Sequence, residues 1–345
     1  MVGPAELARR ARSRVTHRLE SLPILALSVH SACNCRCVMC DIWKANGDKR
    51  EISSDELERH ADAIRALHVQ RVMLTGGEPL LHRNLWALCT KLQALGIRIT
   101  LVTTGLLIDR HAADIAASID TVVISLDGDR DVHDAIRRVK GGFDRIACGV
   151  TALRAENPAP RLIARSVVQR GNCASLRQTI AAAHQLGFDE ISFLAADLSS
   201  SAFNRREPWG AERIDEVAVG VEDLPALETS IEQTIAQSPQ LIHDGFVVGG
   251  RASLDRILQY YRAVSGRADL PAVQCNAPWV SAVLEPDGNV RPCFFHPAYG
   301  SAAAGLEEAL NSPTAMAFRQ SLGVERDETC RRCVCSLNLP LTRTV

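Results

Sequence analysis

Residues 33–40 read Cys33-Asn-Cys-Arg-Cys37-Val-Met-Cys40, and they follow the apolar stretch Ile24-Leu-Ala-Leu-Ser-Val-His30. The apolar stretch predicts a buried strand. Cys33, Cys37 and Cys40 have the spacing Cys-x3-Cys-x2-Cys, and thiolates are ligands that suit iron–sulfur clusters or zinc. Four protein ligands would close such a site, whereas three leave one position open for another ligand, as in catalytic metal sites. We therefore expect an open metal site just past a strand end, where α/β sheets and barrels place their chemistry.

This loop resembles that of the radical S-adenosylmethionine (radical SAM) superfamily, which carries the same spacing after its first strand. The resemblance implies that Cys33, Cys37 and Cys40 bind a [4Fe–4S] cluster. It also implies that SAM binds the fourth iron through its amino and carboxylate groups. Met39 replaces an aromatic residue that is common in the family, and because methionine is an adaptable side chain we interpret it as a tolerated variant. Cys35 is interpreted as a bystander.

Composition excludes several classes of protein. The 345 residues are 46% hydrophobic with a formal charge of −1, which gives no indication of a nucleic-acid partner. No apolar stretch approaches the roughly 20 residues that span a bilayer. The N-terminus is polar and lacks the apolar segment of a signal peptide, so a cytoplasmic protein is expected. Disulfides are rare in that compartment, so clustered cysteines indicate metal binding or catalysis.

Strand and helix patterns alternate from residue 23 onward. Helix patterns near 54–67, 83–95, 108–118, 142–155 and 173–186 separate six apolar strands, predicted at 24–30, 70–75, 98–104, 121–126, 161–168 and 189–194. Strands separated by helices pair in parallel through right-handed crossovers. The predicted fold is α/β, a partial (β/α)6 TIM-like barrel with a small cysteine-rich auxiliary domain at the C-terminus, and the family resemblance implies the same barrel.

Four units are predicted along the chain. Residues 1–22 form a basic helix, 23–196 the barrel, 197–270 a helical bridge and 271–345 the auxiliary iron–sulfur domain. The arginines of the first helix either meet an acidic substrate or belong to a solvated helix packed over one end of the barrel, and we favour the second interpretation.

The second predicted strand ends in Thr75-Gly-Gly-Glu-Pro79. Two glycines let the backbone approach a ligand closely, and the glutamate adds an acceptor. In the radical SAM family this motif holds the methionyl amino group of SAM, so the resemblance assigns cofactor binding to Gly76, Gly77, Glu78 and Pro79. Bulky residues in place of the two glycines are expected to stop SAM binding and to spare the cluster.

Further candidates follow the next strands. Hydroxyl and carboxylate groups at adjacent strand ends suit the polar groups of SAM. The resemblance gives ribose contacts to Ser125, with Thr103 or Thr104 nearby, although many members have asparagine at the threonine positions. Asp127 binds the cofactor or shapes its own loop. Arg137 holds a carboxylate or lies on the surface, and Leu194 forms an apolar wall for adenine or a plain part of the core.

A second group of cysteines lies in the tail. Cys275 precedes Gly288-Asn-Val-Arg-Pro-Cys293, and Cys330-Arg-Arg-Cys333-Val-Cys335 follows. Four thiolates suffice for a closed zinc site or a fully ligated [4Fe–4S] cluster, which spacing does not distinguish. The pattern resembles the auxiliary-cluster extension called SPASM, or twitch in its shortened form. That resemblance implies one auxiliary [4Fe–4S] cluster on Cys275, Cys293, Cys330 and Cys333, with Cys335 competing for the last position and a cluster open to substrate as an alternative.

The resemblance implies an enzyme that cleaves SAM reductively to a 5′-deoxyadenosyl radical, which removes hydrogen from a substrate. An electron donor such as flavodoxin or ferredoxin is expected. The favoured hypothesis is oxidation or rearrangement of a small molecule, assisted by the auxiliary cluster. The alternative is a peptide-modifying enzyme, and a third hypothesis is an electron carrier or zinc-binding module. Asp197, Arg205 and Trp209 are guessed to line the substrate cavity.

Overall fold

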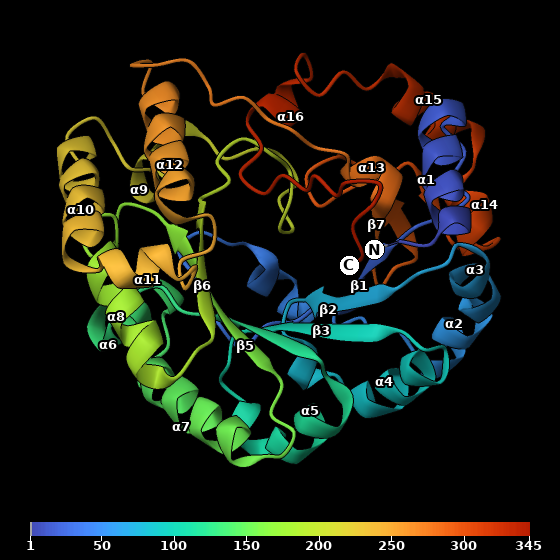
Figure 1. Cartoon of the computed structure of the whole chain (residues 1–345), viewed down its shortest axis with the longest axis horizontal. Coiled ribbons are helices and arrows are strands. Elements are labelled where there is room, and N and C mark those ends of the chain that lie inside the picture. The colour runs from blue at the N-terminus through green and yellow to red at the C-terminus, as the bar shows by residue number, and fades with distance from the viewer. Residues whose placement is uncertain (1) are drawn as a thin grey trace.

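The computed structural model describes residues 2–345, and a curved sheet forms its centre (Figure 1). Six strands run in parallel in the order β6-β5-β4-β3-β2-β1. Each lies within one residue of its predicted bounds: β1 Ile24–His30, β2 Arg71–Gly76, β3 Arg98–Thr103, β4 Thr121–Ser125, β5 Arg161–Val168 and β6 Glu190–Ala195. The predicted partial barrel is therefore confirmed.

Helices cover the outer side of this sheet (Figure 1). They are α2 Ser54–Arg59, α3 Ala61–Ala66, α4 Leu85–Ala94, α5 Ala112–Ser118, α6 Arg130–Arg137, α7 Gly142–Ala155 and α8 Leu176–Leu186. Three short 3-10 helices, η1 Ile42–Gly47, η2 Pro79–Leu81 and η3 Ile108–Arg110, lie in the segments after β1, β2 and β3. The predicted helix at 54–67 is two helices, which meet at His60. Ser53 and Glu56 form a capping box at the start of α2.

Helix α6 is a barrel helix that the hydrophobic pattern did not predict. Its apolar residues share one face, but with eight residues it is shorter than the window of about 11–18 residues over which helical periodicity is recognised. Asp129 caps its first turn by accepting a hydrogen bond from the Val132 amide, at 3.2 Å. The helix follows β4 and ends beside the cysteine loop, where the Arg36 amide donates to the Arg137 carbonyl at 3.3 Å. Its position makes α6 part of the site rather than of the outer shell alone.

The bridge between barrel and tail is largely helical, as predicted. A loop leads from β6 to α9 Ala211–Val217, α10 Leu224–Gln237, α11 Pro239–His243 and α12 Gly250–Val264. Tyr261 of α12 is fully buried, and its hydroxyl donates to the Val168 carbonyl at 2.5 Å and accepts from the Ala196 amide at 3.0 Å. These two bonds fix the start of the loop after β6 against the end of β5.

The tail extends the barrel sheet. Strand β7 Ser281–Leu284 pairs in parallel with β1, and β8 Asn289–Arg291 and β9 Gly300–Ser301 continue it in antiparallel pairs. A hairpin turn at Pro286-Asp-Gly288 connects β7 to β8, with Gly288 at φ 83°. The remaining tail helices are α13 Ala277–Val280, α14 Leu306–Leu310, α15 Pro313–Ser321 and α16 Glu328–Arg331. Barrel and tail therefore share one sheet of nine strands.

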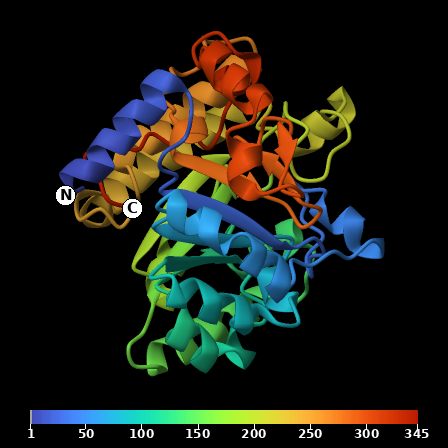
Figure 2. The ribbon, with the colours of Figure 1, turned by 90° about the vertical axis from the view of Figure 1, so that its right-hand side faces the viewer.

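The first helix, α1 Pro4–Thr16, lies beside the C-terminal end of the chain (Figure 2). Arg10 is buried; its Nη1 donates to the Arg343 carbonyl at 2.7 Å and its Nε to Glu6 at 2.8 Å. This arginine joins the two ends of the chain, which agrees with the packing interpretation of the basic helix. No helix within residues 2–345 combines the length and apolar character needed to cross a bilayer.

Candidate active site

The carboxyl ends of the barrel strands surround a cavity of about 270 Å³. Cys33, Cys37 and Cys40 lie in its wall, and the tail contributes Phe294, Phe295, Val334 and Cys335. The wall also contains most of the predicted cofactor-binding residues: Gly76, Gly77, Thr103, Thr104, Ser125, Arg137 and Leu194. The ends of the six strands and the tail thus bring these groups to one cavity, although they lie up to 302 residues apart in the sequence.

Glu78, Pro79 and Asp127 lie behind the wall rather than in it. Glu78 is fully buried and accepts four hydrogen bonds: from the Thr104 amide and hydroxyl at 2.6 Å each, from the Thr103 hydroxyl at 2.8 Å and from the Leu80 amide at 3.0 Å. Burial raises the pKa of Glu78, while these bonds act in the opposite direction. Glu78 therefore fastens the loop after β2 to the loop after β3.

Replacing Thr104 with valine is expected to lower the free energy of unfolding by about 1.5–3 kcal/mol, because it removes one hydrogen bond to a buried carboxylate. The shape of the side chain is nearly retained, so the loss reports the bond. Urea titration of the two proteins measures the difference. Thr90→Val is the matched control, since the Thr90 hydroxyl bonds only to its own helix on an exposed face; equal effects of both substitutions would contradict the role given to Glu78.

The cysteine loop is held by backbone bonds to three neighbours. The Gly77 amide donates to the His30 carbonyl at 2.7 Å, and the Glu78 amide to the Ala32 carbonyl at 2.9 Å. Asn46 makes a reciprocal pair with Cys33, at 2.9 Å in each direction. The Val38 amide donates to the carbonyl of Ile136, in α6, at 3.0 Å. The loop is therefore held by protein groups on three sides.

Arg137 is buried in the cavity wall and faces Cys37. Its Nε donates to Asp127 Oδ2 at 2.6 Å, and its Nη1 lies 3.6 Å from Cys37 Sγ. Burial opposes its charge, but the carboxylate of Asp127 raises the pKa of Arg137 above its ordinary value. The surface alternative for Arg137 is wrong. Asp127 Oδ1 accepts from the Val167 amide at 2.9 Å, so Asp127 shapes its surroundings and orients the arginine.

The thiols of this loop differ in their ionisation. A hydrogen bond from Cys35 lowers the pKa of Cys37 to about 6 against the effect of burial, and the charge of Arg137 adds to this. Burial raises the pKa of Cys40 to about 12. Cys35 is buried outside the cavity wall, in agreement with its interpretation as a bystander.

The auxiliary cysteines gather on the tail side of the cavity. Cys275, Cys293 and Cys333 are partly buried, Cys330 is buried and Cys335 is exposed. Burial is the main cause that raises the pKa of Cys333 to about 12, and the nearby Cys335, Cys275 and Cys293 contribute to this shift. Cys335 lies in the cavity wall, whereas Cys333 does not. Cys335, which competes with Cys333 for the last ligand position of the auxiliary cluster, is thus the one of the two that lines the cavity.

The spacing of the thiols distinguishes two kinds of metal site. A tetrahedral zinc site with Zn–S bonds of about 2.3 Å brings its thiolates within roughly 4 Å of one another. Among residues 2–345, the one group of three potential ligand atoms within 4.8 Å is His296, Asp327 and Cys330. Within these residues neither cysteine group brings three thiol sulfurs within 4.8 Å of one another, so neither is arranged as a preformed zinc site.

Sequence reasoning missed several residues of the site. His296 is buried with its Nε2 3.3 Å from Cys330 Sγ, and only its place three residues after Cys293 could have drawn attention to it. Arg165 and Phe203 line the cavity without any motif. The guesses about the loop after β6 hold in part: Asp197 lines the cavity, Arg205 lines a neighbouring chamber, and Trp209 lies behind Arg205.

Comparison with protein families gives a match at both cysteine groups. The model of the radical SAM superfamily matches residues 27–193, and that of the iron–sulfur cluster-binding SPASM domain matches residues 275–334. The chain belongs to the radical SAM superfamily. It is a radical SAM enzyme with a C-terminal SPASM domain, and the family models coincide with the two groups of thiols described above.

The chain is also similar to individual proteins in sequence and in structure. The GTP 3′,8-cyclase of Geobacter sulfurreducens is 36% identical over 157 residues, which are 43% of this chain and 47% of the cyclase. The chain thus matches about half the length of its curated relatives. SuiB of Streptococcus suis, bound to its precursor peptide SuiA, has 14% identity and a TM-score of 0.62 over 95% of this chain and 74% of SuiB. The enzyme anSMEcpe, with bound AdoMet and the Cp18Cys peptide, has 16% sequence identity and a TM-score of 0.60. This match covers 90% of this chain and 88% of anSMEcpe. These two likenesses show the fold.

Proposed function

We propose that this radical SAM enzyme binds a [4Fe–4S] cluster and SAM in the cavity at the barrel mouth and modifies a peptide. Cys33, Cys37 and Cys40 would hold the cluster. When bound, the cluster and SAM supply a 5′-deoxyadenosyl radical, which removes a hydrogen atom from an unreactive carbon. The work of the protein is then to orient the target carbon and to exclude water from the cavity.

The cavity wall offers partners for each part of SAM. The guanidinium of Arg137 is a partner for the methionyl carboxylate, and its ion pair with Asp127 keeps it in place. Gly76 and Gly77 lie in the cavity wall, where their backbone could meet the amino group, and their lack of side chains lets them pack against the carbonyls of His30 and Ala32. Ser125 offers a hydroxyl for the ribose, and Leu194 an apolar surface for adenine. The hydroxyls of Thr103 and Thr104 already donate hydrogen bonds to Glu78. The hydrogen bond to the ribose would therefore come mainly from Ser125.

In the tail, we propose one auxiliary [4Fe–4S] cluster on Cys275, Cys293, Cys330 and Cys333. Cys335 remains the competitor for the fourth position, and its place in the cavity wall favours an open cluster that faces substrate. A cluster there could accept the second electron of a net oxidation. A flavodoxin or ferredoxin would supply the first electron.

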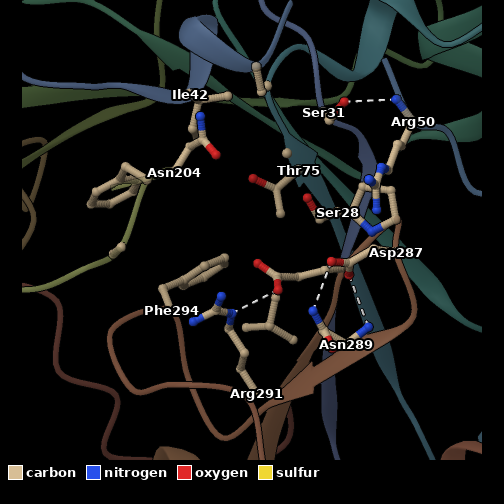
Figure 3. A pocket seen from close by; sticks show the side chains of 18 of the residues that line it. Ser28, Ser31, Ile42, Arg50, Thr75, Asn204, Asp287, Asn289, Arg291 and Phe294 are labelled. Carbon is tan, nitrogen blue, oxygen red and sulfur yellow. Dashed lines mark hydrogen bonds and ion pairs between the residues drawn. The ribbon is translucent and has the colours of Figure 1, made fainter. Parts of the chain in front are cut away.

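The observation that carries the peptide proposal is a second, larger chamber. This outer chamber has a volume of about 430 Å³ and opens to solvent. It adjoins the 270 Å³ cavity in which we propose that SAM binds, called the SAM cavity below. The two share the lining residues Ile42, Thr75, Gly76, Gly77, Phe203 and Phe294. Figure 3 shows Ile42 and Asn204 on one side of it and Arg50, Asp287 and Asn289 on the other, with Thr75 and Ser28 between. An open polar groove that continues into the cavity suits an extended chain better than a small molecule, which enzymes usually enclose.

The charges of this outer chamber argue against a nucleotide substrate. Arg50, Arg205, Arg206 and Arg291 line it, but Asp48, Glu285 and Asp287 lie among them. Arg50 pairs with Asp48 at 2.9 Å, and Arg291 pairs with Glu285 at 2.8 Å. A triphosphate carries several negative charges and would meet a lining whose charges nearly balance. The likeness to GTP 3′,8-cyclases covers 43% of this chain in the Geobacter sulfurreducens protein and is therefore evidence of the family rather than of the substrate.

Solved structures with the same fold bind peptides. SuiB is bound to its precursor peptide, and anSMEcpe to the Cp18Cys peptide. Together with the open chamber, they support a peptide substrate over the small-molecule oxidation that the sequence alone favours.

The test follows hydrogen transfer. Protein from fully deuterated cells is digested to peptides, and a low-mass metabolite extract is prepared from the same cells. Each fraction is incubated anaerobically with the reconstituted, reduced enzyme and unlabelled SAM, and the mass of the 5′-deoxyadenosine formed is measured. Deuterium in this product from the peptide fraction alone is the expected result. Deuterium only from the metabolite fraction would overturn the peptide proposal.

A further inference from the structure

Arg205 lies in the loop after β6, between the SAM cavity and the outer chamber. It is 6% exposed and contributes to the wall of the outer chamber. Its Nη1 donates to Asp197 Oδ2 at 2.7 Å and to the Ser200 carbonyl at 3.3 Å. Asp197 also accepts from the Ser200 hydroxyl at 2.5 Å and lines the SAM cavity. One corner of the guanidinium is therefore bound within the loop.

The other edge of this guanidinium has no partner. Arg205 Nε and Nη2 are buried and make no hydrogen bond to any residue in 2–345. Leaving a buried donor without an acceptor costs about 1–3 kcal/mol, and more when the group is charged. Nε and Nη2 lie on the same side of the planar group and point their hydrogens in parallel, which is the arrangement that binds both oxygens of a carboxylate. The free edge thus has the donor geometry that a carboxylate requires.

Aromatic rings and loop backbone hold this edge in place. The Arg205 Cζ lies 3.7 Å from the centroid of the Trp209 ring, and Phe203 is 5.5 Å away. The Trp209 indole donates to Asp41 Oδ2 at 2.9 Å, which fixes the ring beneath the guanidinium. Phe203 and Asn204 adopt φ values of 58° and 64°, in the left-handed region that residues other than glycine rarely occupy. Such backbone strain is concentrated at ligand clamps and active sites.

The charged groups around Trp209 are paired one to one. Lys44 lies 3.0 Å from Asp41, and Arg205 lies 2.7 Å from Asp197, so each of these carboxylates has one cation. Arg213 stacks on the Trp209 ring, with its Cζ 5.1 Å from the ring centroid, and its Nη1 pairs with Glu216. Each of these carboxylates therefore already has a cation, and none of them reaches the free edge of Arg205.

We propose that the free Nε–Nη2 edge of Arg205 binds a carboxylate of the peptide substrate and sets which residue of the peptide reaches the SAM cavity. The proposal rests on the proposed peptide function and names its chemical class, a peptide with an acidic side chain or a C-terminal carboxylate. Phe203 lies in the walls of both cavities beside Arg205, so the bound carboxylate would lie at the entrance to the reaction site. Arg205 would thus position the peptide and would not itself contact the reacting atoms.

The probes are short blocked peptides, and binding is measured by calorimetry on the cluster-loaded, oxidised enzyme with SAM bound. The four probes are Ac-Ala-Glu-Ala-NH2, Ac-Ala-Gln-Ala-NH2, Ac-Ala-Gln-Ala-OH and the phosphoserine peptide Ac-Ala-pSer-Ala-NH2. We expect at least one carboxylate peptide to bind at least ten times more tightly than the blocked Gln peptide. Arg205→Gln is expected to abolish this preference, and Arg205→Lys to reduce it to threefold or less, because lysine lacks the paired donors.

Arg267→Gln, at an exposed position far from the loop in sequence, is the control and should keep the full preference. Iron content and SAM affinity of each variant show that it has folded, and the Lys variant remains informative if the Gln variant does not fold. Equal binding of all peptides by the wild type, or an unchanged preference in both Arg205 variants, would overturn the proposal. So would a tenfold preference for phosphoserine, or a loss of SAM binding in Arg205→Lys. These outcomes are separate from the deuterium-transfer test, which alone decides whether peptides are substrates.

Discussion

Alanine at position 77 is expected to remove the iron of the SAM cluster together with SAM binding. An added Cβ would overlap the Ala32 carbonyl group and would lie 3.0 Å from the Cys33 amide nitrogen. Both contacts are backbone atoms of the cysteine loop, so no side chain can turn away to make room. Overpacking of this kind costs about 1–3 kcal/mol, and here relief requires that the loop shift.

This expectation corrects the one drawn from sequence, in which substitution of the glycines spares the cluster. The glycine backbone pairs with the loop through Gly77 and Glu78, so the two motifs form one unit. Iron and sulfide analysis and SAM binding of Gly77→Ala test this. Gly47→Ala is the control, because no atom lies within 4 Å of a Cβ there. A Gly77→Ala protein with full iron and weakened SAM binding would show that the sequence-based expectation was right.

Alanine at position 127 is expected to destabilise the protein by about 3–5 kcal/mol, the usual effect of removing one partner of a buried ion pair. Asp127 is fully buried, and Arg137 would be left in the cavity wall without a counter-charge. The amide of Val167 would lose its acceptor as well. Urea denaturation of the protein in the absence of iron measures the effect separately from cluster binding.

Two comparisons make this result specific. Asp127→Ala combined with Arg137→Leu should be less destabilised than Asp127→Ala alone, because the buried charge is removed with its partner. Glu216→Ala breaks the neighbouring exposed pair with Arg138 and should change the free energy of unfolding by less than about 1 kcal/mol. If Asp127→Ala and Glu216→Ala change the free energy of unfolding by the same amount, the buried Asp127–Arg137 pair does not have the stabilising role given to it here.

The barrel could be predicted from sequence because each buried parallel strand is a short apolar run between helix patterns. All six runs became strands, and turn residues such as Gly187 and Gly288 lie where the chain reverses. Helix α6 escaped prediction since eight residues are too few to establish a helical period, although Asp129 marks its start. The pairing of β7 with β1 also escaped, because four residues carry no signal for a partner about 250 positions away.

The candidate site divides in the same way. Residues within motifs, such as the cysteines and Gly76-Gly77, could be placed at the cavity because their spacing has a chemical reason. Residues whose role depends on partners distant in sequence could not be assigned. Glu78 was expected to contact SAM, yet Thr103 and Thr104 use its oxygens. Arg205 was a guess until it was found in the wall of the outer chamber, with its Nε and Nη2 buried and without a partner.

The measurement that tests the central claim most directly is formation of 5′-deoxyadenosine by the anaerobically reconstituted, reduced protein given SAM and deuterated peptides. A variant with alanine at positions 33, 37 and 40 is assayed beside it, with iron content determined for both. The account predicts the nucleoside from the wild type and none from the variant, which keeps the auxiliary cysteines. Equal amounts from both proteins, or no SAM binding by a wild type whose clusters are loaded, would contradict it.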